Sequence, residues 1–230
     1  MVTSTARGWQ VFMNYRKVGR LRYLSHLDVM RALERALRRS ALPVKYTEGF
    51  NRRMRMHFGP ALPVGGEGEA EPVVVELTAP VAANEIVCRL NEQLPAELGV
   101  VCAEVTSPES PSWIDRLHRA RYKAVVIADR FVAASELEAA ISDALATTDL
   151  RVPETSGKLG RTNLRSRIYE LALSADRDDT ILWMTLGVNQ RNYLSPDRCL
   201  AALGSLLTPP AALTWQQLVR TEFLFNDSTS

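Results

Sequence analysis

The chain has 230 residues, of which 46% are hydrophobic and 23% are charged, with a formal net charge of +2. This composition is typical of globular proteins and argues against wholesale disorder or a coiled coil. The longest strictly apolar run spans five residues, 124–128, and residues 2–7 lack the hydrophobic stretch of a secretory signal, so we expect a cytoplasmic protein without a membrane segment.

The small net charge conceals two blocks of opposite sign. Residues 16–57 contain twelve Lys or Arg against three acids, a balance of +9. Residues 58–115 contain one basic residue, Arg89, against ten acids, a balance of −9. Such asymmetry indicates a surface for a polyanion, and an acidic surface that contacts either a partner or the protein's own arginines.

The first half of the chain alternates between strand and helix patterns. Its first helix has the clearest signals, because Ser25 and Asp28 form a capping pair at its start and Pro43 marks its exit. Its expected buried stripe, at three- or four-residue steps, is Leu27, Met30, Leu33 and Leu37. Before this helix, residues 9–24 are expected to form a strand, a turn at Gly19 and an extended continuation; the helix itself spans 26–40. After it we expect strand pieces over 44–46 and 54–58 around a turn at 48–51, and a loop over 65–68. A strand over 73–77, a helix over 82–94 and a strand over 99–105 complete the first half.

The second half repeats this order after a segment, 107–112, whose prolines and serines are typical of an interdomain linker. The expected elements are a strand over 122–128, a helix over 135–147 capped by Ser135, a hairpin of strands over 167–174 and 181–188, a helix over 195–207 with Pro196 in its first position, and a strand over 219–225. The order β-α-β-β-α-β is typical of the ferredoxin-like fold. We therefore expect an α+β protein with two tandem ferredoxin-like domains, 8–107 and 118–226, joined by a linker over 108–117, each with helices on one face of an antiparallel sheet.

Basic and aromatic residues interleave in the first block. Arg31, Arg35 and Arg38 fall on one exposed helical stripe, where guanidinium groups can hold phosphates while nearby aromatic rings stack on unpaired bases. The residues expected to bind RNA are Arg20, Arg22, Tyr23, His26, Arg31, Arg35, Arg38, Arg39, Lys45, Tyr46, Phe50, Asn51, Arg52, Arg53 and Arg55. The alternative is that these arginines only solvate the helix or pair with Glu34, Glu48 or the acidic block. Lys158 and Arg161, with residues 163–167, form a weaker patch that either extends this surface or belongs to a loop.

No strong catalytic or metal-binding pattern is present in the sequence. His26 and Asp28 are weak catalytic candidates, although residues two apart on a helix do not face one another and Asp28 is already explained by capping. The three cysteines, Cys88, Cys102 and Cys199, are too far apart in sequence for a clustered metal site, and we expect them to be reduced and buried. No metal or cofactor is expected.

A set of motifs is formed by residues 19–28, 34–39, 42–43, 49–51 and 62–63, with Gly65 and Glu71. These motifs resemble those of one bacterial family, the uncharacterised radical-SAM-linked (radical-SAM-associated) proteins. The resemblance implies a radical-SAM protein as partner, but the family has no established activity that the resemblance could assign to this chain. At the level of fold only, the chain is distantly similar to the CRISPR repeat-processing endoribonucleases. We therefore expect a non-enzymatic RNA-binding accessory protein that works with a radical-SAM partner in RNA modification or processing; the alternatives are a metal-independent endoribonuclease and a protein-only assembly scaffold.

Overall fold

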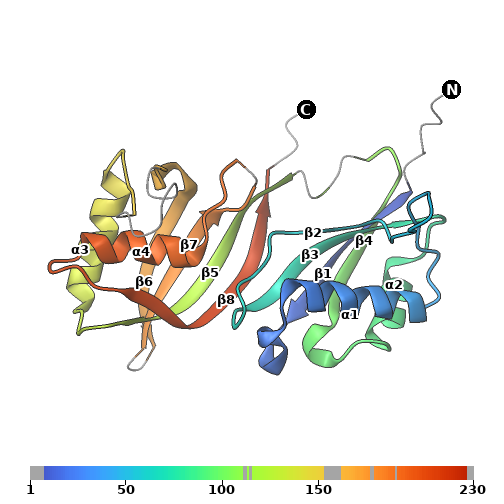
Figure 1. Cartoon of the computed structure of the whole chain (residues 1–230), viewed down its shortest axis with the longest axis horizontal. Coiled ribbons are helices and arrows are strands. Elements are labelled where there is room, and N and C mark those ends of the chain that lie inside the picture. The colour runs from blue at the N-terminus through green and yellow to red at the C-terminus, as the bar shows by residue number, and fades with distance from the viewer. Residues whose placement is uncertain are drawn as a thin grey trace. The chain divides into compact units, whose positions relative to one another are not determined.

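The computed structural model describes residues 8–110, 113, 116–152, 162–176, 179–189 and 191–226. Over these residues the chain is a mixed α+β protein with four α-helices and eight strands (Figure 1). It divides into two compact units: unit 1 consists of Met1–Leu117 and Phe225–Ser230, and unit 2 of His118–Leu224. No helix of the described part is long and apolar enough to cross a bilayer.

Unit 1 has the expected β-α-β-β-α-β order. Its elements are β1 (Trp9–Lys17), the 3-10 helix η1 (Gly19–Tyr23), α1 (His26–Arg39), β2 (Met56–Phe58), β3 (Glu67–Leu77), α2 (Ala83–Asn91), the 3-10 helix η2 (Ala96–Leu98) and β4 (Val100–Thr106). The sheet order is β4-β1-β3-β2, and every neighbouring pair is antiparallel. Both helices lie on one face of this sheet (Figure 1).

The core of unit 1 lies between its sheet and its helices. Alternate residues of β1, namely Val11, Met13 and Tyr15, point into it and meet the apolar residues of β3. The helix side is formed by Val29, Leu33, Ala36 and Leu37 of α1 and by Ile86 and Leu90 of α2. The predicted stripe was therefore wrong at its start: Leu27 is 59% exposed, and Val29 and Ala36 take the buried positions.

An aromatic cluster covers the other face of β1. Phe12 stacks on Trp113 with ring centroids 4.7 Å apart, and Phe225 meets both rings edge-on at 5.6 Å. Phe225 belongs to unit 1 although it lies near the end of the chain. Unit 1 is thus built from two chain segments, whereas the sequence-based boundaries assigned residue 225 to the second domain.

Unit 2 repeats the element order of unit 1. Its elements are β5 (Leu117–Ala128), α3 (Ala134–Ala146), the 3-10 helix η5 (Arg165–Arg167), β6 (Ile168–Asp176), β7 (Asp179–Gly187), α4 (Pro196–Leu206) and β8 (Leu213–Phe225). The strand order is β8-β5-β7-β6, and β7 is antiparallel to both β5 and β6. Helices α3 and α4 lie on one face of the strands (Figure 1). The predicted hairpin is confirmed, as is Pro196 in the first position of α4. Ser195 caps this helix by accepting a hydrogen bond from the Arg198 amide.

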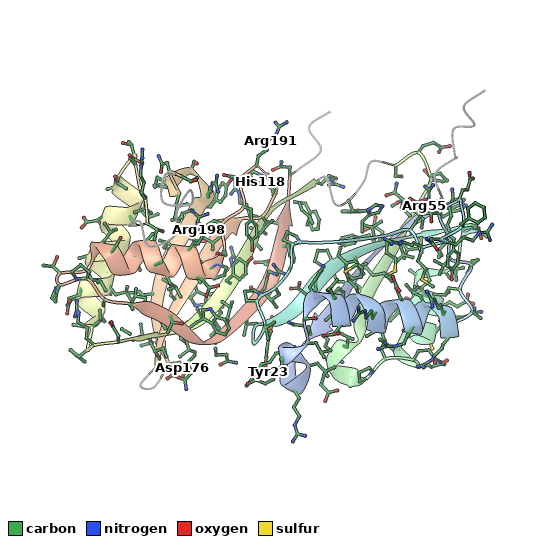
Figure 2. All side chains as sticks on the ribbon, viewed as in Figure 1. Tyr23, Arg55, His118, Asp176, Arg191 and Arg198 are labelled. Carbon is green, nitrogen blue, oxygen red and sulfur yellow. The ribbon has the colours of Figure 1, made fainter. Side chains whose placement is uncertain are left out.

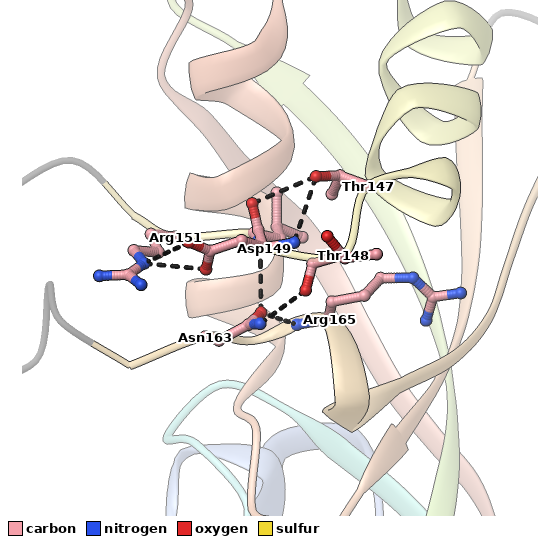
Figure 3. A network of polar contacts seen from close by, with 7 residues as sticks. Thr147, Thr148, Asp149, Arg151, Asn163 and Arg165 are labelled. Atoms are coloured by element: carbon pink, nitrogen blue, oxygen red, sulfur yellow. Dashed lines mark hydrogen bonds and ion pairs between the residues drawn. The ribbon is translucent and has the colours of Figure 1, made fainter.

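A polar network closes the segment after α3 (Figure 3). The side-chain oxygen of Asn163 accepts hydrogen bonds from the amides of Leu150 and Arg165, and its Nδ2 donates to the Thr148 carbonyl. Arg165 donates from Nε to the carbonyl of Leu145 and from its guanidinium to that of Ile168. Arg165 therefore connects the end of α3 to the start of β6. Lys158 and Arg161 of the predicted weaker patch lie outside the described residues.

Some expected elements differ from those observed. Residues 19–23 form a 3-10 turn rather than an extended continuation, and Gly19 has a φ of +60° that suits glycine. The expected loop over 65–68 is correct for Gly65 and Gly66, which precede β3, but Glu67 and Gly68 belong to the strand. Gly68 pairs with Lys17, and a Cβ there would overlap the Glu71 side chain unless that side chain moved. Ala133 rather than Ser135 occupies the N-cap position of α3, and its amide donates a hydrogen bond to the Glu136 carboxylate. Cys88 and Cys102 are exposed, and only Cys199 is buried as expected.

The start of α1 provides a direct test of its predicted cap. The Ser25 hydroxyl accepts a hydrogen bond from the Asp28 amide at 3.2 Å and donates to the Asp28 carboxylate at 2.6 Å. Ser25→Ala should lower the free energy of unfolding by about 1 kcal/mol, measured by urea denaturation, whereas Ser25→Asn should retain most of it because Asn is also a good cap. Equal losses for the two variants would show that the hydroxyl does not cap the helix.

Candidate nucleic-acid interface

The predicted RNA-binding residues begin at the turn between β1 and α1. Lys17, which is almost fully buried, donates from Nζ to the carbonyls of Arg22 at 3.1 Å and Leu24 at 3.4 Å. A buried ammonium needs such partners, so these contacts fasten the turn to the end of β1. Lys17 was not among the predicted site residues. Its hydrogen bonds to the backbone on either side of Tyr23 fix the position of Arg22 and Tyr23.

Arg22 and Tyr23 form a preorganised pair at this turn. The Arg22 guanidinium lies 5.0 Å from the centre of the Tyr23 ring and donates to its hydroxyl at 3.0 Å and to Glu67 at 3.1 Å. The hydrogen bonds to Tyr23 and then to Glu67 raise the pKa of Arg22. Tyr23 itself is 62% exposed, so its ring is accessible. The neighbouring Arg20 is exposed as well.

The exposed face of α1 carries the predicted arginine stripe. Arg31, Arg35 and Arg38 are all exposed, and the exposed Leu27 precedes them at the same helical spacing. Arg31 lies 3.7 Å from Asp28, and Arg38 lies 3.9 Å from Glu34, which are long, solvent-exposed pairs of small energetic value. Within the described residues, no carboxylate pairs with Arg35 or Arg39. The arginine stripe therefore retains positive charge that the nearby carboxylates of the described chain neutralise only weakly.

Beyond α1, residues 45–55 fold into a hairpin. The Arg55 amide donates to the Lys45 carbonyl at 3.0 Å, the Thr47 amide donates to the Arg53 carbonyl at 2.8 Å, and Tyr46 bridges to Met54. Gly49, with a φ of +108°, makes the predicted turn at the tip. The Phe50 side chain is fully exposed there, with Asn51, Arg52 and Arg53 exposed beside it, and Tyr46 is 38% exposed.

Part of the acidic block pairs with these basic residues. Glu67 binds Arg22, and Glu76 lies within 4.0 Å of Lys45 and 3.4 Å of Arg55. Acids far away in the sequence thus pair with Arg22, Lys45 and Arg55. For these three residues the structure agrees with the alternative prediction, that the basic residues pair with the acidic block. The remaining arginines of the predicted set are either in weak exposed pairs or without a carboxylate partner in the described chain.

The two weak catalytic candidates face different surroundings. The His26 ring packs edge-on against Phe58, with centroids 5.6 Å apart, and lines a small cavity with Lys17 and Glu71. Asp28 is exposed, and the hydrogen bond from the Ser25 hydroxyl lowers the pKa of its carboxyl group. Asp28 therefore acts as a capping carboxylate, and His26 as a ring packed at the edge of the core.

The predicted residues thus form three groups on unit 1: the turn before α1, the exposed face of α1, and the hairpin 45–55. Tyr23 and Arg55 lie toward opposite ends of unit 1, as Figure 2 shows. The 14-residue α1 is about 21 Å long, which gives the scale of this surface. We call these three groups the basic surface. In the described part of the chain, no cluster of His, Cys, Asp and Glu could hold a metal ion.

The sequence-based interpretation missed the exposed Leu27 and the supporting roles of Lys17 and Glu67. A helical projection that included Val29 and Ala36 with Leu33 would have placed Leu27 on the arginine side, since Leu27 precedes Arg31 by four residues. No local signal pointed to Lys17 or Glu67, because their partners lie in other elements.

Most of the chain matches one known protein family. Residues 10–196 match the family described as "Uncharacterized protein conserved in bacteria (DUF2344)". The chain belongs to this family. No curated protein is detectably similar in sequence.

Solved structures share the fold at low sequence identity. The protein in "Crystal Structure of a Cbf5-Nop10-Gar1 Complex" superposes with a TM-score of 0.55 at 13% identity, covering 94% of this chain and 50% of that one. The protein in "Structure of H/ACA RNP bound to a substrate RNA containing 2'-deoxyuridine" superposes with a TM-score of 0.50 at 12% identity, covering 98% of this chain and 55% of that one. This chain thus spans about half the length of these structural neighbours.

Proposed function

We propose that this protein is an RNA-binding accessory protein and that the basic surface of unit 1 contacts the RNA. The observation that carries the proposal is the fully exposed Phe50 at the tip of the hairpin, beside the exposed Arg52 and Arg53. An aromatic ring held in water at a tight turn offers a stacking platform for an unpaired base, and the adjacent guanidiniums can hold the flanking phosphates.

Two further features support the same proposal. The exposed arginines of α1 add phosphate contacts along one helix, and Tyr23 adds a second accessible ring at its start. The shared fold with a protein from the structure of an H/ACA RNP bound to a substrate RNA is in keeping with an RNA-related role. A location in the cytoplasm is part of the proposal.

The proposal also includes the tandem ferredoxin-like assignment. Each unit has the order β-α-β-β-α-β, and in each the first strand lies between the fourth and the third. This arrangement supports the assignment. If each unit folds as a domain, limited proteolysis should first cut the chain within 107–117, at the predicted linker, and leave two resistant fragments. Early cuts only at the chain ends would contradict the division into two domains.

A radical-SAM protein is the partner we propose, and the chemistry belongs to that partner. An iron–sulfur cluster requires several converging cysteine thiolates. Here Cys88 and Cys102 are exposed on different elements, and complete burial raises the pKa of Cys199 to about 12, which keeps its thiol protonated. Retention of a radical-SAM protein of the same bacterium on the immobilised chain, weakened by salt, would support the pairing. Failure to retain it at low salt would remove this part of the proposal and leave RNA binding intact.

A labelled single-stranded RNA incubated with the purified protein tests the function. Retention without cleavage supports an RNA-binding protein, cleavage indicates an endoribonuclease, and neither result indicates a protein-only scaffold. If about five phosphates are neutralised, affinity should fall roughly 100-fold for a single strand between about 50 and 200 mM salt.

Phe50 allows the stacking part of the proposal to be tested separately. Phe50→Ala should weaken binding of single-stranded RNA about tenfold, because stacking of one base on an aromatic ring contributes about 1–3 kcal/mol. Phe50→Trp is the matched control and should bind at least as well as the natural protein. The exposed position predicts unchanged thermal stability for both variants, and equal RNA affinity for both would show that the ring does not stack on a base.

A further inference from the structure

A second set of cations and aromatic rings lies in unit 2, on the sheet face away from α3 and α4. Along β5, Ala120, Tyr122 and Ala124 are at most 1% exposed. Successive side chains of a strand point to opposite faces, so Arg119, Arg121 and Lys123 share the other face, where all three are partly exposed.

Cross-strand pairing places an aromatic ring beside this row. Lys123 is paired directly with Trp183 of β7, and its Nζ lies 5.9 Å from the centre of the Trp183 ring. The indole is partly exposed, and its Nε1 donates to the Ser174 hydroxyl of β6. On β6, the residue paired with Trp183 is Ala172, whose side chain is a single methyl group.

Arg121, in the middle of the row, is already neutralised. It pairs with Glu222 at 2.6 Å and with Glu170 at 3.7 Å, and the Thr185 hydroxyl donates to Glu170. Arg121 therefore ties together β5, β6 and β8. It also engages Glu170 and Glu222, so that these two acids do not neutralise the cations on either side.

Arg119 is oriented by stacking on a tyrosine ring and has no acid partner among the described residues. Its guanidinium lies 3.8 Å from the centre of the Tyr169 ring. Its Nε is buried without a hydrogen-bond partner, and no carboxylate of the described chain pairs with it. Because Nε is covered, the terminal guanidinium nitrogens are the donors that would hold a phosphate oxygen, and their charge is not neutralised by a paired carboxylate of the described chain.

The ring under Arg119 is itself fixed. The Tyr169 hydroxyl lies 3.2 Å from His118 Nε2 and accepts a hydrogen bond from Asn192 Nδ2 at 2.7 Å, while Asn189 contacts the other nitrogen of the His118 ring. The loop that carries Asn192 packs so closely on Gly187 that a Cβ there would overlap the Asn192 carbonyl. Arg191 of the same loop lies at the same end of unit 2 as His118 (Figure 2).

We propose that this face of unit 2 is a second RNA-binding surface, on which Arg119 holds a phosphate and Trp183 stacks an unpaired base next to Lys123. The inference rests on the proposed function and adds a second contact for single-stranded RNA, separate from the basic surface. Stacked guanidiniums bind phosphate in a fixed orientation, and a sheet face carries aromatic rings at a spacing that suits successive bases.

Fluorescence anisotropy of a labelled single-stranded oligouridine bound to the full chain tests this surface. Arg119→Gln should weaken binding about tenfold and lower the salt slope by about 0.7, the value for one phosphate contact on a single strand. Trp183→Ala should weaken binding about tenfold, and Trp183→Phe should largely restore it. Arg151→Gln is the matched control, because Arg151 is an exposed arginine of the same unit paired with Asp149.

Circular dichroism melting establishes whether each variant is folded. If Arg119→Gln unfolds, Lys123→Gln replaces it as the test, because Lys123 has no ion pair in the described chain. A severalfold loss for Lys123→Gln and a larger one for Trp183→Ala support the surface. Affinities equal to that of the Arg151 control would overturn it, while loss of binding on substitution of the α1 arginines would still support the proposed function. If the natural protein binds no RNA, both proposals fail.

Discussion

Replacing Arg31, Arg35 and Arg38 together by Glu should abolish RNA binding at physiological salt. The three side chains are exposed on one face of α1, opposite the buried Val29, Leu33, Ala36 and Leu37. The substitution removes three phosphate contacts and adds three negative charges, so we expect a loss of roughly 100-fold or more and a salt slope lower by about 2 for a single strand. Anisotropy with a labelled single-stranded RNA at several salt concentrations measures both.

The control for this variant must change the net charge equally elsewhere. Three arginines lie outside the basic surface: the exposed Arg16 on β1, the partly exposed Arg89 on α2 and the exposed Arg151 in unit 2. Their joint replacement by Glu should weaken binding far less, because only the long-range field changes. A variant with Lys at the three α1 positions keeps the positive charge but loses the bidentate hydrogen bonds of arginine, so it shows how much of the affinity depends on each. If both Glu triples weaken binding equally, the effect is one of net charge and the α1 stripe is not the contact surface.

Leu33→Ala should destabilise unit 1 by about 2–5 kcal/mol, whereas Leu27→Ala should change stability by about 0.5 kcal/mol or less. Both substitutions remove the same atoms from the same helix, but Leu33 is 1% exposed and Leu27 is 59% exposed. Truncation of Leu33 leaves a cavity between α1 and β1, while the site of Leu27 is filled by water. Urea denaturation followed by circular dichroism measures the difference. Similar losses for the two variants would mean that α1 presents Leu27 to the core.

Local patterns predicted much of the architecture. The bounds of α1 and its Ser25 cap, the β6–β7 hairpin, and α4 with Pro196 in its first turn all agree with the structure. Capping, helical periodicity and turn formation involve residues within a few positions of one another, so the sequence pattern contains the interacting groups themselves. The order of elements in both units was predictable for the same reason.

The errors occurred where a distant element decides the outcome. Leu27 was assigned to the core because it is apolar, but the position of the sheet under Val29 and Leu33 selects a face of α1 rotated away from it. The acidic and glycine-rich start of β3 was predicted as a loop, yet pairing with β1 extends the strand to Glu67. Strand pairing depends on the partner strand, which short sequence windows do not include.

The basic surface shows the same division. The amino-acid sequence alone determined the arginine stripe of α1 and the turn that presents Phe50, since helical spacing and a glycine turn are local properties. Only the tertiary structure decided that Glu67 and Glu76 hold Arg22 and Arg55, and that Arg119 stacks on Tyr169 fifty residues away. The physical reason is that sheet formation brings together side chains far apart in the chain, and a shift in register by one residue would move each of them to the opposite face.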